Sequence, residues 1–472
     1  MLRRSLPLVL STVLFVFSSY LVNVWLGRHL GPADYGVLGV VTSLLSSLNV
    51  MQVSGVPQGM AKLIAEDSSQ ADDVLRVGLR LQLALSVLLV AVFAGLSPLL
   101  ADLFKEPDLV GYVLLAALVL PGYGLLTVYG GYYQGLHRFG RQAKLSAVYA
   151  VAKLFLVISL SLAFGIEGAL VGYALSPLVA LAWGFHRPRG PGRFDPRRLV
   201  ALGMPLVGYS ALSLLMYSVD LFSVKALAGA AVNTGYYVAA QSVSIIPFLG
   251  LAGLGQVTLP SVASHLGAGD RSEAGRVASQ ALRYQLLLLL PATALIAGSA
   301  HEVVVMLFGS AYAPAGSVLR VLVLAYVPVS LFGLLASILN GAGRARQAML
   351  LAGLGVVVGL GLCLWWVPVW GLVGAASGMG CGAAIAMGAS VAVVRRAAPV
   401  SVAGATLVRG AIASLVVGAL AALPVPAPAL VALWPLLLLV YGGLLLAMGE
   451  VTPDERDQAR SLFARVRPGK RS

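Results

Sequence analysis

The sequence predicts an all-α membrane protein that crosses the bilayer many times. Of its 472 residues, 59% are hydrophobic and only 11% are charged, whereas soluble proteins carry about 25% charged residues. Disordered chains are poor in apolar residues, so disorder is excluded. The 18 acids and 32 bases are too few to cover the surface of a large soluble enzyme. The apolar stretches are long and do not alternate with a period of two, which excludes a β-barrel.

About fourteen stretches are long enough to span a membrane, since one helix needs roughly 20 apolar residues. They lie near residues 6–26, 36–56, 78–100, 110–131, 144–164, 167–186, 200–226, 236–258, 280–300, 315–339, 346–367, 370–393, 403–422 and 427–448. The sequence between them is too short for an extramembrane domain. The first stretch is longer than the apolar part of a signal peptide, so we expect it to stay in the protein.

Lysine and arginine gather on alternate loops, which predicts the orientation. If the N-terminus is cytoplasmic, most of the 32 bases fall on the inner side, and the outer loops keep Arg28 and Lys105. Positive charge marks cytoplasmic loops, so both termini are predicted to be cytoplasmic. This distribution explains the net charge of +14 without a nucleic-acid partner.

An internal repeat divides the chain into two similar parts. Residues 165–172 read GIEGALVG and residues 371–378 read GLVGAASG, and the same offset pairs Gly135 with Gly341. Each copy would contain six spans, which predicts two pseudo-symmetric six-helix lobes of parallel topology with a cleft between them, as in transporters. Two further C-terminal helices lie outside the repeat.

The predicted boundaries follow from the repeat and from charge. They are 1–186 for the N-terminal lobe, 187–199 for a basic cytoplasmic linker, 200–396 for the C-terminal lobe, 397–449 for the two extra helices and 450–472 for a basic cytoplasmic tail. Segments 57–77 and 260–279 are predicted to be short amphipathic connectors with a structural role.

A few charged residues fall within or next to the spans, where charges are costly and mark transport pathways. They are Arg28, Lys153, Asp220, Lys225 and Arg320. Four bases and one acid predict a cationic cleft that prefers an anion, and Arg and Lys suit phosphate. Polar residues on the lining spans would add sugar contacts, and the candidates are Asn23, Tyr217 and Gln241, with weaker ones that include Gln58.

Each of these charged residues also has a purely structural interpretation. Arg28 and Lys225 would extend their side chains to the membrane interface. Lys153 would make a hydrogen bond within or between the lobes. Asp220 would either form an ion pair with Arg320, which we expect at a similar depth, or couple transport to an ion.

The sequence carries no pattern of a cofactor, metal or catalytic site. It lacks a glycine-rich phosphate loop that ends in Lys-Ser/Thr. Its five histidines are scattered and form no zinc motif. Cys363 and Cys381 lie in apolar segments and are interpreted as small buried packing residues. We therefore expect neither a metal nor a cofactor, and no enzyme.

Three motifs resemble those of a known family. They are LGRHLGPADYGV at 26–37, YYQGLHRFG at 132–140, and Asp220 followed by NTGYYVAA at 233–240. With these motifs and with twelve spans plus two, the chain resembles the polysaccharide biosynthesis flippases of the multidrug/oligosaccharidyl-lipid/polysaccharide exporter superfamily. The resemblance covers nearly the whole chain.

This resemblance implies two lobes around a central cavity lined by spans one, two, seven and eight. It implies that a polyprenyl-(di)phosphate-linked oligosaccharide or polysaccharide precursor crosses the cytoplasmic membrane by alternating access, without ATP. Arg28, Asp220 and Lys225 are the cavity residues that it favours. The implied partners are the lipid-linked sugar, membrane lipids, and a glycan polymerase or glycosyltransferases.

Three other functions stay open. A cation-coupled multidrug exporter of the same superfamily would favour acids in the cavity, but Asp220 stands alone there. A membrane enzyme of glycan assembly would normally need an outer domain. A scaffold that binds lipid-linked sugars without moving them would look the same in sequence.

Overall fold

The structure is a computed structural model that describes residues 2–189, 194–401, 403–451 and 455. Within these residues every regular element is a helix, which confirms the all-α class. Most of the predicted tail 450–472 and part of the linker 187–199 lie outside the described residues.

The first half of the chain forms six α-helices. They are α1 (Leu2–Ser54), α2 (Val56–Glu66), α3 (Ala71–Phe104), α4 (Leu109–Ala117), α5 (Val119–Gly135) and α6 (Phe139–Gly184). Helix α1 carries the first two predicted spans and is broken at Gly31, where φ is 76°. Helix α6 carries the fifth and sixth spans and is broken at Phe164 and Gly165.

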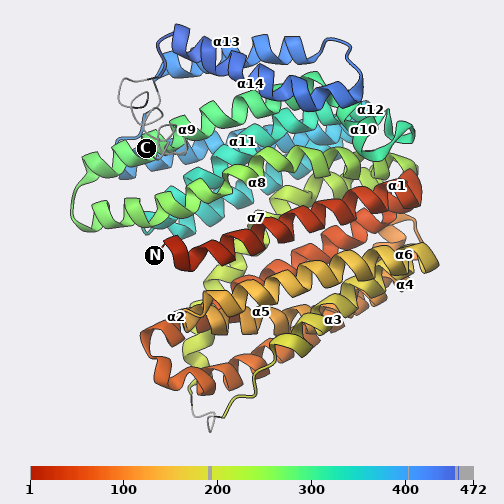
Figure 1. Cartoon of the computed structure of the whole chain (residues 1–472), viewed down its shortest axis with the longest axis vertical. Helices are drawn as coiled ribbons and strands as arrows, with labels where there is room; N and C mark the ends of the chain where they lie inside the picture. The colour runs from red at the N-terminus through yellow and green to blue at the C-terminus, as the bar shows by residue number, and fades with distance from the viewer. Residues whose placement is uncertain (1, 190–193, 402, 452–454, 456–472) are drawn as a thin grey trace, which may run out of the picture.

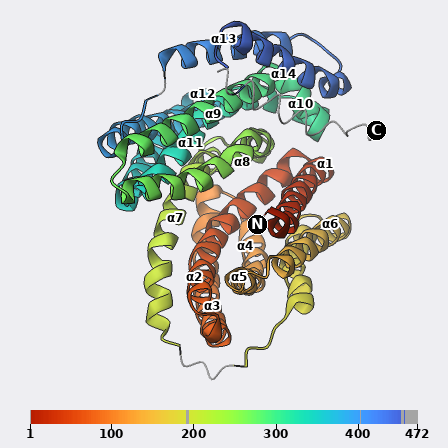
Figure 2. The ribbon, with the colours of Figure 1, turned by 60° about the vertical axis from the view of Figure 1, so that its left-hand side comes forward.

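The second half repeats this plan and adds two helices. Its helices are α7 (Pro196–Leu227), α8 (Ala231–Gly267), α9 (Arg271–Gly298), α10 (Ala300–Phe308), α11 (Ala315–Gly341), α12 (Ala345–Ala397), α13 (Gly404–Ala421) and α14 (Leu430–Ala447). Helix α12 is broken at Gly371. Helices α1–α6 form one side of the molecule, α8–α12 form the other, and α13 and α14 lie at the edge farthest from α1–α6 (Figures 1 and 2).

The protein is a multi-pass membrane protein by the length and composition of its helices. Nine helices in the described residues are long and apolar enough to cross a bilayer. Three of these are the broken helices α1, α6 and α12, and each carries two of the predicted spans. Large apolar side chains also cover the outside, for example Leu415 and Leu439, as expected where lipid is the solvent. The exact number of crossings stays a prediction.

The backbone reproduces the repeat that the sequence predicts. Helices α5 and α11 end 206 residues apart at Gly135 and Gly341, and α6 and α12 begin at the same offset. The break at Gly165 (φ 57°, ψ −128°) matches the break at Gly371 (φ 56°, ψ −133°). L-residues rarely adopt this region, which explains the two glycines.

Two predictions about local structure need correction. Segment 57–77 contains the separate helix α2, but its counterpart at 260–279 contains no separate helix, because α8 continues through Pro260 to Gly267. Cys363 is buried as expected, whereas Cys381 is exposed. An apolar helix in a membrane protein is apolar on its lipid-facing side as well. The apolar neighbours of Cys381 in the sequence therefore do not show that it packs against protein.

The molecule has two ends, which are named here for later use. The kink end contains the breaks at Gly31, Gly165 and Gly371. The linker end contains helix α2, the turn at His137 and the described ends of the linker, residues 187–189 and 194–199. The ends lie on opposite sides of Figure 1, with α10 on the right at the kink end and α2 on the left at the linker end.

Candidate transport site

An ion pair joins the two halves at the kink end. Lys225 Nζ, near the end of α7, lies 2.9 Å from Glu106 Oε2, in the turn after α3. The Lys225 side chain is only 4% exposed, so its ammonium depends on this carboxylate for compensation. Lys225 is therefore not an unpaired cation in this state. Sequence reasoning missed Glu106, although both residues belong to the predicted outer side.

Arg28 makes a second connection between the halves. Its guanidinium donates from Nε to the carbonyl oxygen of Leu307 at 2.7 Å and from Nη2 to that of Met306. These carbonyl groups lie at the C-terminal end of α10, where a helix carries partial negative charge and its last carbonyls lack helical partners. A further hydrogen bond joins the same two segments, because Tyr312 Oη donates to the carbonyl oxygen of Gly27 at 2.7 Å.

Two glycines bring the backbones of α1 and α8 into direct contact. A Cβ added to Gly36 would lie 2.6 Å from the amide nitrogen of Gly235, and a Cβ added to Gly235 would overlap the carbonyl oxygen of Pro32. These glycines end the related motifs Asp-Tyr-Gly and Asn-Thr-Gly of the two repeats. The kink end is thus closed by backbone packing as well as by charge.

Lys153 is buried within the N-terminal half. Its ammonium donates to Ser19 Oγ and lies 4.4 Å from the centroid of the Phe15 ring and 5.5 Å from that of Tyr149. Aromatic faces stabilise a cation in this position. The intralobe hydrogen bond that the sequence suggested for Lys153 is therefore present.

The ion pair suggested between Asp220 and Arg320 is wrong. Asp220 is fully buried on α7, where its carboxylate accepts hydrogen bonds from Tyr237 Oη at 2.7 Å and from the Leu221 amide at 2.9 Å. Arg320 Nε instead donates to the carbonyl oxygen of Ala297 at 3.1 Å. Asp220 is thus bonded within α7 and to the neighbouring α8, and Arg320 on α11 is bonded to α9.

The predicted polar contacts have separate environments. Asn23 accepts a hydrogen bond from Tyr35 Oη on the same helix. Gln241 is half-buried on α8. The side chain of Tyr217 lies outside the described part of the chain. Among the side chains that the structure describes, the predicted site residues do not line the cavities at either end of the molecule, and most of them make contacts between helices.

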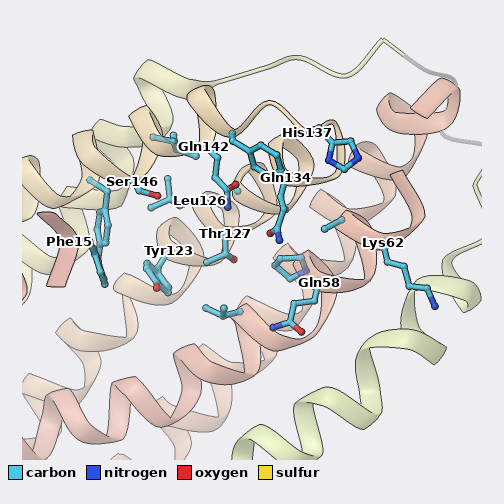
Figure 3. Close-up of a pocket in the computed structure, with 18 of the residues that line it drawn as sticks. Phe15, Gln58, Lys62, Tyr123, Leu126, Thr127, Gln134, His137, Gln142 and Ser146 are labelled. Atoms are coloured by element: carbon cyan, nitrogen blue, oxygen red, sulfur yellow. The ribbon is translucent and has the colours of Figure 1, made fainter. Parts of the chain in front are cut away.

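A cavity of about 720 Å³ lies at the linker end, within the N-terminal half. Helices α1, α2, α5 and α6 line it (Figure 3). The lining combines aromatic rings with amide and hydroxyl groups, including Tyr123, Tyr149, Gln58, Gln134 and Gln142. Sequence reasoning named Gln58 only as a weak candidate and missed the others, since single polar residues on apolar helices carry little signal.

A hydrogen-bond cluster beside this cavity holds the start of the linker. Asp72, in the first turn of α3, accepts from Tyr132 Oη at 2.8 Å, from the Arg189 amide at 3.0 Å and from His186 Nε2 at 3.1 Å. Asp72 lies before the predicted span 78–100. Partial burial opposes its ionisation, but these hydrogen bonds outweigh burial and lower its pKa. The carboxylate thus anchors the linker to the N-terminal half.

The closed kink end and the cavity at the linker end are the features that can support transport. No cluster of His, Cys, Asp and Glu in the described residues is arranged to hold a metal ion.

Solved structures share this fold. A structure described as lipid II flippase MurJ in an inward closed conformation has a TM-score of 0.77 at 13% identity, over 97% of this chain and all of that one. A multidrug resistance MATE family transporter of the MOP superfamily in an inward-facing conformation has a TM-score of 0.68 at 18% identity, over 81% of this chain and 94% of that one.

Sequence comparisons identify the family. The lipid III flippase of Escherichia coli (strain K12) is 28% identical over 187 residues, and the lipid III flippase of Shigella flexneri matches equally. These matches cover 38% of this chain and 44% of each relative, so the chain spans less than half the length of the curated relatives it matches. A family described as polysaccharide biosynthesis protein matches residues 25–317, more than half of the chain. The chain therefore belongs to the polysaccharide biosynthesis protein family.

Proposed function

We propose that the protein is a flippase that moves a polyprenyl-(di)phosphate-linked saccharide across the cytoplasmic membrane. The family match over residues 25–317 supports this proposal, as does the similarity to proteins described as lipid III flippases. The observation that carries it is structural. The two halves are closed together at the kink end by the Lys225–Glu106 ion pair and the Gly36–Gly235 contact, while a ligand-sized cavity lies at the linker end.

We infer from the distribution of basic residues that the linker end and both chain termini are cytoplasmic. In that orientation the end where the two halves are joined faces outward, and the cavity of the N-terminal lobe lies on the side where the substrate is made. The two lobes, 1–186 and 200–396, would then rock about the linker at 187–199.

Transport under this proposal needs the kink end to open. The Lys225–Glu106 pair and the contacts of Arg28 with the end of α10 would separate, which would leave both cations without their present partners at the outer side. Such cations attract a phosphate head group, so the residues that close the kink end would also receive the substrate in the outward-facing state. This agrees with the cationic cleft that the sequence suggests.

The protein would act as a transporter and not as an enzyme. Its partners would be the lipid-linked sugar and membrane lipids, and the glycosyltransferases or polymerase that make and consume the substrate. Asp220, fully buried beside Tyr237 on α8, is the residue we propose for coupling to an ion.

Reconstitution in vesicles tests the proposal. Purified protein is placed in vesicles whose inner leaflet holds undecaprenyl-diphosphate-linked N-acetylglucosamine, and a membrane-impermeant galactosyltransferase with UDP-galactose modifies the sugars that reach the outer leaflet. We expect faster modification than in protein-free vesicles and in vesicles with the Gly235→Trp variant, which cannot close the kink end. Equal rates in all three would reject the proposal.

Multidrug export is the second candidate, because MATE transporters share the fold. Cationic drugs need acidic residues in the binding site, but none of the described residues that line the cavity is acidic. Uptake of ethidium into the same vesicles, unaffected by the lipid-linked sugar, would favour the exporter instead.

A further inference from the structure

One wall of the cavity at the linker end is aromatic. Phe15 on α1 stacks against Tyr149 on α6, with ring centroids 5.8 Å apart and planes at 26°. Tyr123 on α5 meets the same Tyr149 ring at 5.7 Å. All three rings line the cavity, and Phe15 and Tyr123 lie together at one end of it in Figure 3. This wall offers flat, apolar faces from three different helices.

Neutral polar groups form the rest of the lining. Gln58, Gln134 and Gln142 come from α2, α5 and α6, and hydroxyl groups of Thr127 and Ser146 lie between the amides and the rings (Figure 3). The carbonyl oxygen of the Gln142 side chain is buried and has no hydrogen-bond partner within the described part of the chain. A buried acceptor without a partner is costly, so it indicates a donor that binds in the cavity.

The cavity carries little charge. Lys62 is the one lysine or arginine among the described lining residues, and its side chain is 61% exposed. In Figure 3 it points away from Tyr123 and Thr127. Lys153 lies behind the aromatic wall, where it is held by Ser19 and Phe15. Such a lining suits a neutral ligand rich in donors and acceptors better than an isolated anion.

The second half of the chain shows that the fold does not require this lining. The offset of 206 residues places Val329 where the first half has Tyr123, and Gly355 where it has Tyr149. It likewise places Ala348 at the position of Gln142 and Ala352 at that of Ser146. Helix bounds follow the same offset here, so the positions correspond. These four side chains are thus specific to one lobe, whereas the position of Gln134 keeps an amide in the second half as Asn340.

We propose that this cavity binds the sugar rings of the saccharide that the protein transports, inside the N-terminal lobe and apart from the cleft between the lobes. Sugar rings present C–H faces, which pack on aromatic rings, and hydroxyl or acetamido groups, which pair with amides and hydroxyls. The volume of about 720 Å³ lies within the roughly 300–1,000 Å³ typical of ligand pockets. The inference rests on the proposed function and concerns the state described here, in which the kink end is closed.

Native mass spectrometry of the full chain in nanodiscs tests this assignment. The two probes are undecaprenyl diphosphate and undecaprenyl-diphosphate-linked N-acetylglucosamine, which differ only in the sugar. We expect the wild-type protein to bind the sugar-bearing probe about three- to tenfold more tightly, the range of one or two added hydrogen bonds. Equal affinity for the two probes would overturn the proposal.

Two variants locate the preference in the cavity. Gln142→Ala and Tyr123→Val introduce the residues that the second repeat carries at the equivalent positions, so the helices can accept them. Each should reduce the preference for the sugar to below about twofold and leave binding of undecaprenyl diphosphate unchanged, which also reports correct folding. Gln347→Ala, at an exposed glutamine near the start of α12, is the matched control and should keep the preference. A preference that survives in both cavity variants would contradict the proposal.

This experiment fails separately from the test of the proposed function. Transport in vesicles without a sugar preference in binding would reject the saccharide site but keep the flippase. A sugar preference that depends on Gln142 and Tyr123, without transport, would keep the site and reject the flippase.

Discussion

Single residues in this protein connect segments that lie far apart in the sequence. Lys225 and Glu106 are 119 residues apart, and Arg28 reaches a carbonyl group 279 residues away. The Lys225 side chain is only 4% exposed, so its charge needs a partner, whereas Arg28 is exposed and joins the halves through hydrogen bonds. These residues would separate when the kink end opens. They would then have two successive roles: first they close the kink end, and later they receive the phosphate of the substrate.

Replacing Glu106 by Gln should destabilise the described state. The Lys225 ammonium would stay buried without its carboxylate, and because the Glu106 side chain is 26% exposed, we expect a loss of about 1–3 kcal/mol, below that of a fully buried pair. Thermal unfolding in detergent measures it. The double variant Glu106→Gln/Lys225→Met should recover most of the stability, and a double variant less stable than both singles would contradict this account.

Gly235 is the residue where a single methyl group should matter most. Gly235→Ala places a Cβ against the backbone of Pro32, which cannot move as a side chain can, so α1 and α8 must separate. We expect loss of transport in the vesicle assay with normal amounts of protein in the membrane. Gly250→Ala on the same helix is the control, because its Cβ would meet no other atom within 4 Å. Equal transport by the two variants would show that the contact is unimportant.

At the scale of elements, three pairs of predicted spans form long helices with a single break, where separate helices joined by a loop were expected. Helices α1, α6 and α12 each pass through a break at the kink end and return. The break at Gly165 and the break at Gly371 share one backbone conformation. A repeat that preserves a strained conformation indicates that the geometry of the turn matters for how each lobe packs.

Alanine at either break should cost about 1 kcal/mol of stability, since left-handed backbone is unfavourable for L-residues. A Cβ at Gly165 or Gly371 would meet no other atom within 4 Å, so the cost arises from the backbone alone and should be similar in both variants. Gly353→Ala, in open space within helical α12, should instead be neutral or stabilising. Chemical denaturation of the three variants compares them, and equal stability of all three would contradict the explanation.

At the scale of the whole molecule, one end is closed and the other contains a cavity. The closed end joins the halves through α1, α7, α8 and α10, whereas the cavity lies within one lobe. The asymmetry between two similar lobes is therefore chemical. The repeat determines the helix plan, and the residues that differ between the copies give the cavity of the N-terminal lobe its aromatic and polar lining.

The orientation of the whole molecule can be tested with two cysteine variants. Lys62→Cys lies at the linker end and Lys105→Cys at the kink end, and both positions are exposed. A membrane-impermeant maleimide added to intact cells should label the Lys105 variant and should label the Lys62 variant only after the cells are opened. Because Cys363 is buried but Cys381 is exposed, both cysteine variants carry Cys381→Ala as well. The reverse pattern would place the linker end outside.

The sequence by itself determined the membrane class, the two-copy helix plan and the family resemblance. These properties depend on composition, on the length of apolar stretches and on the spacing of glycines. All three can be read along the chain without knowing which residues contact one another in the folded protein. Only the tertiary structure decided which charges are paired, because Glu106, Leu307 and Ala297 become partners of Lys225, Arg28 and Arg320 through folding. It also decided where the cavity lies, since Phe15, Gln58, Tyr123 and Gln142 come from four helices and share a surface only when those helices pack.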